Sequence, residues 1–328
     1  MDRWASLDPL LRGVSRSFYL SLRVLPKELR PQISLAYLLA RASDTVADTK
    51  VVPRERRLEL LRGMREGRTA SVRELAAGQA LPAERKLLER LDECLALKAS
   101  LESGDRALID KLLDTIIGGQ IFDLERFAGG DAGSIVALSD DAELDRYTYM
   151  VAGCVGEFWT RICAARLPAL RARDVESLVP LGVRLGKGLQ LVNVLRDVPR
   201  DLRIGRCYLP VRDPRALLEP SAFPGVRAEY HRWLDAALEH LDAGWRYTLS
   251  MPVSLWRLRL ACGWPIWIGL GTLARLRKAN PLDPDVVVRV PQSETNGLLL
   301  RSSMTCWSEK LLNSKYQELR QEAKRSTP

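Results

Sequence analysis

Apolar residues recur at helical spacing along most of this chain of 328 residues. One such stripe runs from Ile33 to Val46, a second from Leu87 to Leu97 and a third from Leu108 to Ile117. Apolar side chains three and four residues apart share one face of a helix, and that face is buried against other helices. We expect further helices at residues 143–165, 174–197, 226–250, 255–279 and 293–322.

The sequence carries no comparable signal for a sheet. The short β-like piece Val286–Val290 follows two prolines and is interpreted as a connector between helices. Glycines and prolines interrupt the chain in several places, but none of these breaks is a long linker. The pattern therefore predicts a single all-α domain over residues 1–317, followed by a polar, disordered tail over residues 318–328.

Charge and cysteine content narrow the classes of function. The net charge is +9, but the basic residues are spread along the chain and form no compact run, which argues against nucleic acid as a partner. Six cysteines without a C-x-x-C pair are typical of reduced core thiols in a cytoplasmic protein. The chain has only two histidines, so a zinc site or a Ser-His-Asp triad is disfavoured.

The first candidate site is a pair of aspartates within an apolar helical stripe. Asp44 and Asp48 are four residues apart, so both carboxylates project from one face of the helix, and Arg41 lies about one turn earlier. Two like charges at this spacing destabilise a helix by about 0.2–0.5 kcal/mol. A hard cation such as magnesium would reverse that effect, because it prefers carboxylate, water and phosphate oxygens as ligands.

A second pair repeats the spacing far along the chain. Asp197 and Asp201 are again four residues apart, and Asn193 and Gln190 continue the same polar stripe toward the N-terminus. Pro199 lies between the two aspartates, and a proline inside a helix removes a hydrogen bond and bends the helix. The geometry of this second pair is therefore less well defined by the sequence than that of the first.

Each aspartate pair by itself is weak evidence for a site, because aspartates four residues apart are common on solvated helix faces. Two pairs, each preceded by an arginine and embedded in apolar sequence, favour a diphosphate site in which bound metal neutralises the leaving group. Guanidinium groups are suited to gripping phosphates, although each one is as readily interpreted as a surface ion pair. The arginines near the two pairs are Arg41, Arg196, Arg203 and Arg206.

Three ordered motifs in this chain resemble those of the squalene and phytoene synthases. The first joins Ser15-Arg-Ser-Phe18 to the aspartate segment Ala40–Asp48. The second, Tyr147–Gly156, reads Tyr-Thr-Tyr-Met-Val-Ala-Gly-Cys-Val-Gly, and the third is Leu189–Arg206 around the second aspartate pair. The resemblance covers about residues 8 to 310, and it is most marked toward bacterial squalene synthases.

The resemblance implies an all-α isoprenoid synthase fold with a central apolar cavity. It implies that the four aspartates Asp44, Asp48, Asp197 and Asp201 are catalytic and hold magnesium, and that Tyr147 acts in the first half-reaction. The residues that fall where the family contacts its substrate are Arg16, Ser17, Phe18, Tyr37, Arg41, Gln190, Asn193, Arg196 and Arg206. Those expected to bind the cofactors are Arg16, Arg41, Arg196 and Arg289.

The resemblance also implies a reaction in two halves. Two farnesyl diphosphates condense head to head to presqualene diphosphate, which a squalene synthase then rearranges and reduces with NADPH. The alternatives within the family are dehydrosqualene or phytoene synthesis without a reductant, and capture of water to give hydroxysqualene. A more remote alternative is a non-catalytic relative that acts as an assembly factor, although that relative has lost its aspartate motifs and this chain keeps all four residues.

A membrane surface is the remaining partner that the sequence suggests. The apolar segment Pro252–Leu273 contains several tryptophans but is interrupted by Arg257 and Arg259, so we do not expect it to span a bilayer. Together with the basic charge, it favours peripheral contact with an anionic surface on the inner face of the membrane. The alternative is a helix that is wholly buried in the core.

Overall fold

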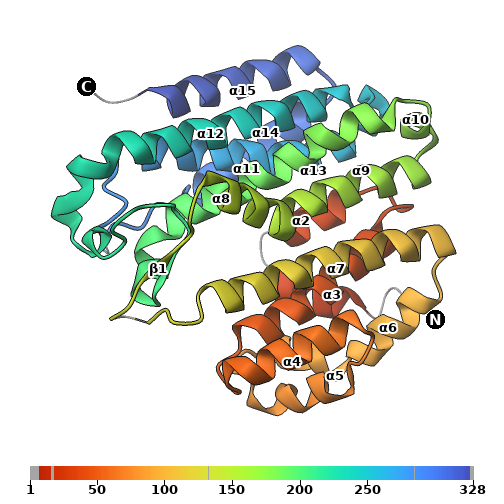
Figure 1. Ribbon diagram of the computed structural model, residues 1–328. Helices are drawn as coiled ribbons and strands as arrows, with labels where there is room; N and C mark the ends of the chain where they lie inside the picture. The colour runs from red at the N-terminus through yellow and green to blue at the C-terminus, as the bar shows by residue number, and fades with distance from the viewer. Residues whose placement is uncertain (1–6, 16–17, 132, 284, 326–328) are drawn as a thin grey trace. The chain divides into compact units, whose positions relative to one another are not determined.

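The computed structural model describes residues 7–15, 18–131, 133–283 and 285–325. The chain divides into two compact units, one formed by residues 1–125 and 158–173 and the other by residues 126–157 and 174–328. Nearly all regular structure in the described ranges is helical, which confirms the predicted fold class (Figure 1). That residues 1–317 form one domain stays a prediction.

The first unit is built on two long helices, α3 and α7. Helix α3 has Pro31 in its first turn, where the missing N–H costs nothing, and it buries the apolar stripe predicted from Ile33 to Val46. The other helices are shorter, and five of them, α1, α2, α4, α5 and α6, pack against α3. The elements of this unit are α1 (Asp8–Ser15), α2 (Phe18–Val24), α3 (Arg30–Asp48), α4 (Arg54–Arg65), η2 (Ala70–Gly78), α5 (Pro82–Glu89), α6 (Leu91–Ala99), α7 (Ser103–Arg126, which ends one residue beyond it), most of α9 (Cys154–Arg166) and α10 (Pro168–Arg171).

The second unit is a bundle of long helices around α11 (Figure 1). A short parallel strand pair, β1 with β2, joins residues 136–137 to residues 206–207. The elements are β1 (Val136–Ala137), α8 (Asp141–Thr148), the π-helix η3 (Tyr149–Gly153), the start of α9, α11 (Val175–Arg203), β2 (Arg206–Cys207), η4 (Ala216–Leu218), η5 (Pro220–Ala222), α12 (Phe223–Ser250), η6 (Val253–Leu255), α13 (Trp256–Leu276), α14 (Gln292–Thr305) and α15 (Glu309–Lys324).

Glycines let the neighbours of α11 approach its backbone closely. A Cβ atom on Gly186 would lie 2.1 Å from the carbonyl oxygen of Ala152 in η3, and one on Gly156 would lie 1.9 Å from the carbonyl oxygen of Gly182. No side chain fits at such distances, so η3 and the start of α9 rest directly on the α11 backbone. This contact fixes the part of α11 that precedes the second aspartate pair.

Three of the predicted helices are divided in the structure. The stripe from Leu87 to Leu97 is split at Arg90 between α5 and α6. The helix expected at 143–165 contains the π-helical turn η3, and the one expected at 293–322 breaks at residues 306–308 into α14 and α15. Residues 318–324, expected to be disordered, continue α15, because Leu319 and Ala323 are buried. Residues 286–290 form neither helix nor strand, which agrees with the predicted connector.

The tryptophan-rich segment and the cysteines both lie mainly in the core. Trp264 and Trp267 of α13 are buried, so the predicted surface role of this segment is wrong for them, and only Trp256 at its start is partly exposed. All six cysteines are buried and free, as predicted. Within the described ranges, no helix has both the length and the apolarity that crossing a bilayer requires.

Candidate active site

The first aspartate pair lies at the C-terminal end of α3, in the first unit. Asp48 is exposed and Asp44 is partly exposed. Two side chains contact Asp44: the Nε2 of Gln120 on α7 donates to its Oδ1 at 2.8 Å, and the Nη1 of Arg41 lies 3.4 Å from its Oδ2. Asp44 is therefore held from two directions, whereas Asp48 projects from the end of the helix.

The two carboxylates perturb each other. Burial, reinforced by the charge of Asp48, raises the pKa of Asp44 above its ordinary value, even though Arg41 and Gln120 act in the opposite direction. The ionised pair at neutral pH is thus an electrostatic cost to the folded chain. A bound cation would remove that cost, which is the behaviour expected of a metal site.

Arg41 links the pair to a neighbouring helix. Its Nη2 forms an ion pair with the Oε1 of Glu84 on α5 at 2.5 Å. A hollow of about 470 Å³ opens between these side chains and the loop that follows η2. Arg41 and both aspartates line it, so the first unit brings these three predicted residues into one cavity.

Helices α3 and α7 are joined by two reciprocal hydrogen bonds. Gln120 of α7 donates to Asp44 of α3, and Gln32 of α3 donates to the Oδ2 of Asp105 of α7 at 2.9 Å. Both glutamines are buried, and the Oε1 atom of each finds no hydrogen-bond partner among the residues that the structure describes. Gln120 could not be predicted from the sequence, because no local pattern connects it with an aspartate 76 residues away.

The second aspartate pair lies in the last turns of α11, in the second unit. The guanidinium of Arg196 donates to both oxygens of Asp197, at 2.8 and 2.7 Å, and this pairing raises the pKa of Arg196. The helix continues through Pro199 to Arg203. The carbonyl oxygen of Leu195, which the proline cannot bond, accepts a hydrogen bond from the Oη of Tyr230 at 2.9 Å.

The chain turns back directly after the second pair. Gly205 adopts a φ of 78°, a left-handed conformation that ends α11 and that only glycine adopts without strain. The next residue, Arg206, begins β2, and its guanidinium lies 6.0 Å from the ring centroid of Phe127. Arg206 therefore follows α11 after a turn of two residues, and the pairing of β2 with β1 fixes its backbone.

Tyr147 is buried near the C-terminal end of α8. Its ring stacks on that of Tyr208, with the centroids 4.7 Å apart, and Tyr208 in turn meets the edge of Phe127 at 5.0 Å. Tyr147 was among the residues predicted from the sequence, whereas Tyr208 was not. The two tyrosines and Phe127 form one aromatic cluster beside β2.

The remaining predicted residues lie on α3, on α11, in the segment after α13 and near the N-terminus. Asn193 and Gln190 are partly buried on α11, about one and two turns before Asp197, and Arg289 is exposed in the irregular segment after α13. Tyr37 donates its hydroxyl to the carbonyl oxygen of Val14 at 3.2 Å. Arg16 and Ser17 lie outside the described residues, as does the side chain of Phe18, the first residue of α2.

A family model for squalene/phytoene synthases matches residues 11–294. The chain belongs to this family. It is 31% identical over 241 residues to a presqualene diphosphate synthase of Rhodopseudomonas palustris, a match that covers 70% of this chain and 74% of that protein. It is 32% identical over 210 residues to the corresponding synthase of Zymomonas mobilis and 28% identical over 203 residues to the squalene synthase of Schizosaccharomyces pombe, and the chain covers 60% and 43% of these two relatives.

Solved structures show that this family member shares its fold with other members. The squalene synthase of Alicyclobacillus acidocaldarius superposes with a TM-score of 0.57 at 22% identity, covering 85% of this chain and 94% of that one. A ligand complex of a dehydrosqualene synthase superposes with a TM-score of 0.59 at 18% identity, covering 96% and 97%. The isoprenoid synthase fold implied by the motifs is thereby confirmed.

The donor groups of both pairs fit magnesium. In the described part of the chain, no three acidic, histidine or cysteine side chains come close enough together to hold a metal without other ligands. Each pair offers two carboxylates, and magnesium ordinarily takes one or two carboxylates and completes its shell with water and phosphate oxygens. The orphaned, buried Oε1 of Gln120 beside Asp44 is an acceptor that a water molecule could satisfy.

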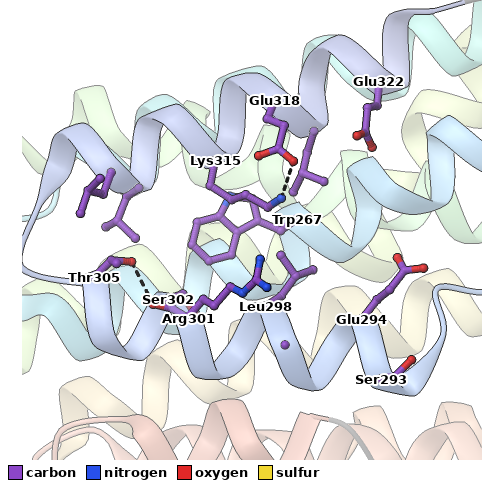
Figure 2. Close-up of a pocket in the computed structure, with 14 residues that line it drawn as sticks. Trp267, Ser293, Glu294, Leu298, Arg301, Ser302, Thr305, Lys315, Glu318 and Glu322 are labelled. Atoms are coloured by element: carbon purple, nitrogen blue, oxygen red, sulfur yellow. Dashed lines mark hydrogen bonds and ion pairs between the residues drawn. The ribbon is translucent and has the colours of Figure 1, made fainter.

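The second unit contains a cavity that is larger than the one beside Asp44 and Asp48. It has a volume of about 620 Å³ and is lined by residues of α13, α14 and α15, with the buried indole of Trp267 between α14 and α15 (Figure 2). Lys315 pairs with Glu318 at 2.7 Å across its wall, and none of the predicted site residues lines it.

Proposed function

We propose that this family member joins two molecules of farnesyl diphosphate head to head to form presqualene diphosphate. The observation that carries the proposal is the pair of repeated Asp-x-x-x-Asp segments on α3 and α11, each with an arginine bonded to its first aspartate. Relatives with 31% and 32% identity are named for this reaction, which supports it further. The proposal requires the two pairs to face one shared apolar chamber.

The proposed reaction breaks one C–O bond and one C–H bond and forms two C–C bonds. The C–O bond of one farnesyl diphosphate breaks, its electrons leave with the diphosphate, and the double bond of the second molecule attacks the resulting allylic cation. Loss of one proton closes the cyclopropane ring, so two substrates give presqualene diphosphate, diphosphate and a proton. Magnesium held by Asp44, Asp48, Asp197 and Asp201 would neutralise the charge that develops on the departing diphosphate.

The other residues of the site have supporting roles in this proposal. Arg41 and Arg196 already hold the aspartates, and with Arg206 they would bind phosphate oxygens. Tyr147 would act in the first half-reaction, with its ring fixed by Tyr208. Apolar walls would keep water from the cation, which reacts quickly with it.

We further propose a second step in which presqualene diphosphate loses its diphosphate, and the rearranged cation takes a hydride from NADPH to give squalene and NADP+, with Arg16, Arg41, Arg196 and Arg289 binding the cofactors. Arg289 supports this step, because it is exposed and available to an anionic cofactor. The test is incubation of the purified chain with farnesyl diphosphate and magnesium, with and without NADPH. Squalene formed only with NADPH supports the second step. Presqualene diphosphate in both incubations limits the enzyme to the first, and dehydrosqualene or hydroxysqualene would reject the reductive route.

Substitution of the aspartates tests the first step directly. Asp44→Asn and Asp197→Asn are each expected to slow diphosphate release by more than about a hundredfold, because metal ligands contribute at least as much as the groups that orient them. Asp114→Asn is the matched control, because this exposed aspartate of α7 pairs with Arg65 and is not among the residues that line the cavity at the first aspartate pair. Unchanged turnover in Asp44→Asn would reject the metal role of that residue.

A further inference from the structure

Glu84 is an acidic residue of the first cavity that belongs to none of the sequence motifs. It lies in the first turn of α5, two residues after Pro82, which begins the helix. A negative charge is favourable in the first turn of a helix, but a glutamate there ordinarily extends into water. The Glu84 side chain is only 16% exposed, because it is directed toward Arg41 of α3.

The start of α5 is attached to the end of α3 at a second point. The Nε2 of the buried Gln79, which precedes α5, donates to the Oγ1 of Thr49, which follows α3, at 3.1 Å. The carbonyl oxygen of Gln79 in turn accepts a hydrogen bond from the Nη2 of Arg85 at 3.2 Å. The backbone that carries Glu84 is therefore fixed beside the first aspartate pair.

Arg41 is held more firmly by Glu84 than by Asp44. Its Nη2 lies 2.5 Å from the Oε1 of Glu84, whereas its Nη1 lies 3.4 Å from the Oδ2 of Asp44, and the Asp44 side chain is 49% exposed. Water screens the more exposed of the two ion pairs more strongly. The Nε of Arg41 is buried and has no partner among the described residues, which is unfavourable by itself, so the ion pair with Glu84 offsets the cost of this position.

The contact with Glu84 leaves Arg41 free for a second task. A guanidinium has five N–H donors, and the short ion pair with Glu84 is made by Nη2. In the proposed reaction Asp44 binds magnesium and Arg41 binds phosphate oxygens. The ion pair with Glu84 competes with neither role, since it uses no atom of Asp44.

We propose that Glu84 is a positioning residue for diphosphate binding, whose carboxylate holds the guanidinium of Arg41 in the cavity beside the first aspartate pair. Glu84 itself does not touch the diphosphate. This inference rests on the proposed function, because it takes Arg41 as a phosphate ligand. It also gives a reason for a third acid in a cavity that would receive an anion. The charged residues that line this cavity are Arg41, Asp44, Asp48, Lys50 and Glu84.

Binding of inorganic pyrophosphate to the full chain in saturating magnesium, measured by calorimetry, tests the proposal. Glu84→Gln removes a negative charge from the cavity, so Coulomb attraction alone would make an anion bind more tightly. If Glu84 positions Arg41, the affinity should instead fall by about tenfold or more, as it does when a group that orients a ligand is lost. Unchanged or tighter binding in Glu84→Gln would overturn the proposal, as would failure of the unaltered chain to bind pyrophosphate.

A double-mutant cycle shows whether Glu84 acts through Arg41. Arg41→Gln should weaken pyrophosphate binding, and adding Glu84→Gln to it should cause less than about a twofold further loss, because the residue that Glu84 holds is already gone. Losses that multiply in the double variant would mean that the two residues act independently, which contradicts the proposal.

Glu93→Gln is the matched control for the charge change. Glu93 of α6 accepts hydrogen bonds from the Nε and Nη2 of Arg90, both at 2.7 Å, and it is not among the residues that line this cavity. This variant should bind pyrophosphate as the unaltered chain does, and its thermal unfolding without ligands should resemble that of Glu84→Gln. An equal loss of affinity in Glu93→Gln would assign the effect to general destabilisation and overturn the proposal.

The two proposals can fail separately, because pyrophosphate binding requires no prenyl substrate. A chain that binds pyrophosphate through Glu84 and Arg41 but forms no presqualene diphosphate would reject the proposed reaction and keep the role of Glu84. In turnover with farnesyl diphosphate, Glu84→Gln should raise KM more than it lowers kcat, because a phosphate ligand acts on the bound substrate as well as on the transition state. A lower kcat with an unchanged KM would contradict the positioning role.

Discussion

Replacement of Gln120 by leucine tests how the first aspartate pair is held. The substitution removes the amide whose Nε2 lies 2.8 Å from the Oδ1 of Asp44, and it leaves that oxygen without its donor. A hydrogen bond to a charged group contributes about 1.5–3 kcal/mol to the free energy of unfolding. Burial of the apolar leucine side chain offsets part of this loss. We therefore expect the free energy of unfolding at pH 7 to fall by about 1–2 kcal/mol.

The substitution should also weaken metal binding. Gln120 lowers the pKa of Asp44, so its loss raises that pKa further and leaves less of the ionised carboxylate for magnesium. Groups that orient a metal ligand typically contribute about 10–100-fold to metal affinity. The assay is a thermal-shift titration with magnesium in the presence of inorganic pyrophosphate, together with chemical denaturation in the absence of metal.

Gln32→Leu is the matched control for this experiment. Gln32 is equally buried on the same helix pair and also donates to a carboxylate, that of Asp105, at 2.9 Å. Asp105 retains its ion pair with Arg166, so the stability loss should be similar or smaller, and the magnesium affinity should be unchanged. If both variants weakened magnesium equally, or Gln120→Leu left it unchanged, the special role of Gln120 would be refuted.

Three further predictions concern the second unit. Tyr230→Phe leaves the buried carbonyl of Leu195 without its donor, so chemical denaturation should show a loss of about 1–3 kcal/mol, and an unchanged midpoint would contradict the hydrogen bond. Burial and nearby cations lower the pKa of His240 to about 4, so the folded ring stays neutral while the unfolded ring gains a proton near pH 6.5. Stability should therefore fall by about 1–2 kcal/mol as the pH drops from 6.5 toward 4, allowing for solvent screening of the partly exposed ring, and His240→Asn should remove that slope. Gly186→Ala places a methyl group 2.1 Å from the carbonyl oxygen of Ala152, so a melting temperature equal to that of the parent chain would refute the close packing that we describe.

Features that depend on local spacing were predictable from the sequence. The apolar stripe of α3 fixed both the helix and the shared face of Asp44 and Asp48, because side chains four residues apart must project together. The break before α15 was also indicated locally in the sequence, but the helical spacing of apolar residues over 293–322 led us to predict one continuous helix. Ser308 caps α15 by accepting the N–H of Leu311 at 3.3 Å, and a serine followed by an acid is a typical helix start.

Features that depend on distant partners were not predictable. Gln120 meets Asp44 across 76 residues, and Tyr208 meets Tyr147 across η3, α9, α10, α11 and β2, so no short window of sequence contains both members of either pair. Pro199 was expected to disturb the second aspartate pair. The structure keeps the helix intact, because a hydroxyl from another helix takes over the orphaned carbonyl.

That exchange makes two positions of the chain mutually dependent. Pro199 withdraws one donor from the backbone of α11, and Tyr230 supplies one from α12 in its place. Family members with an ordinary residue at the first position have no need of a hydroxyl at the second, whereas members that keep the proline should keep the tyrosine. The two positions are therefore expected to covary in relatives, although they lie on different helices and are far apart in the sequence.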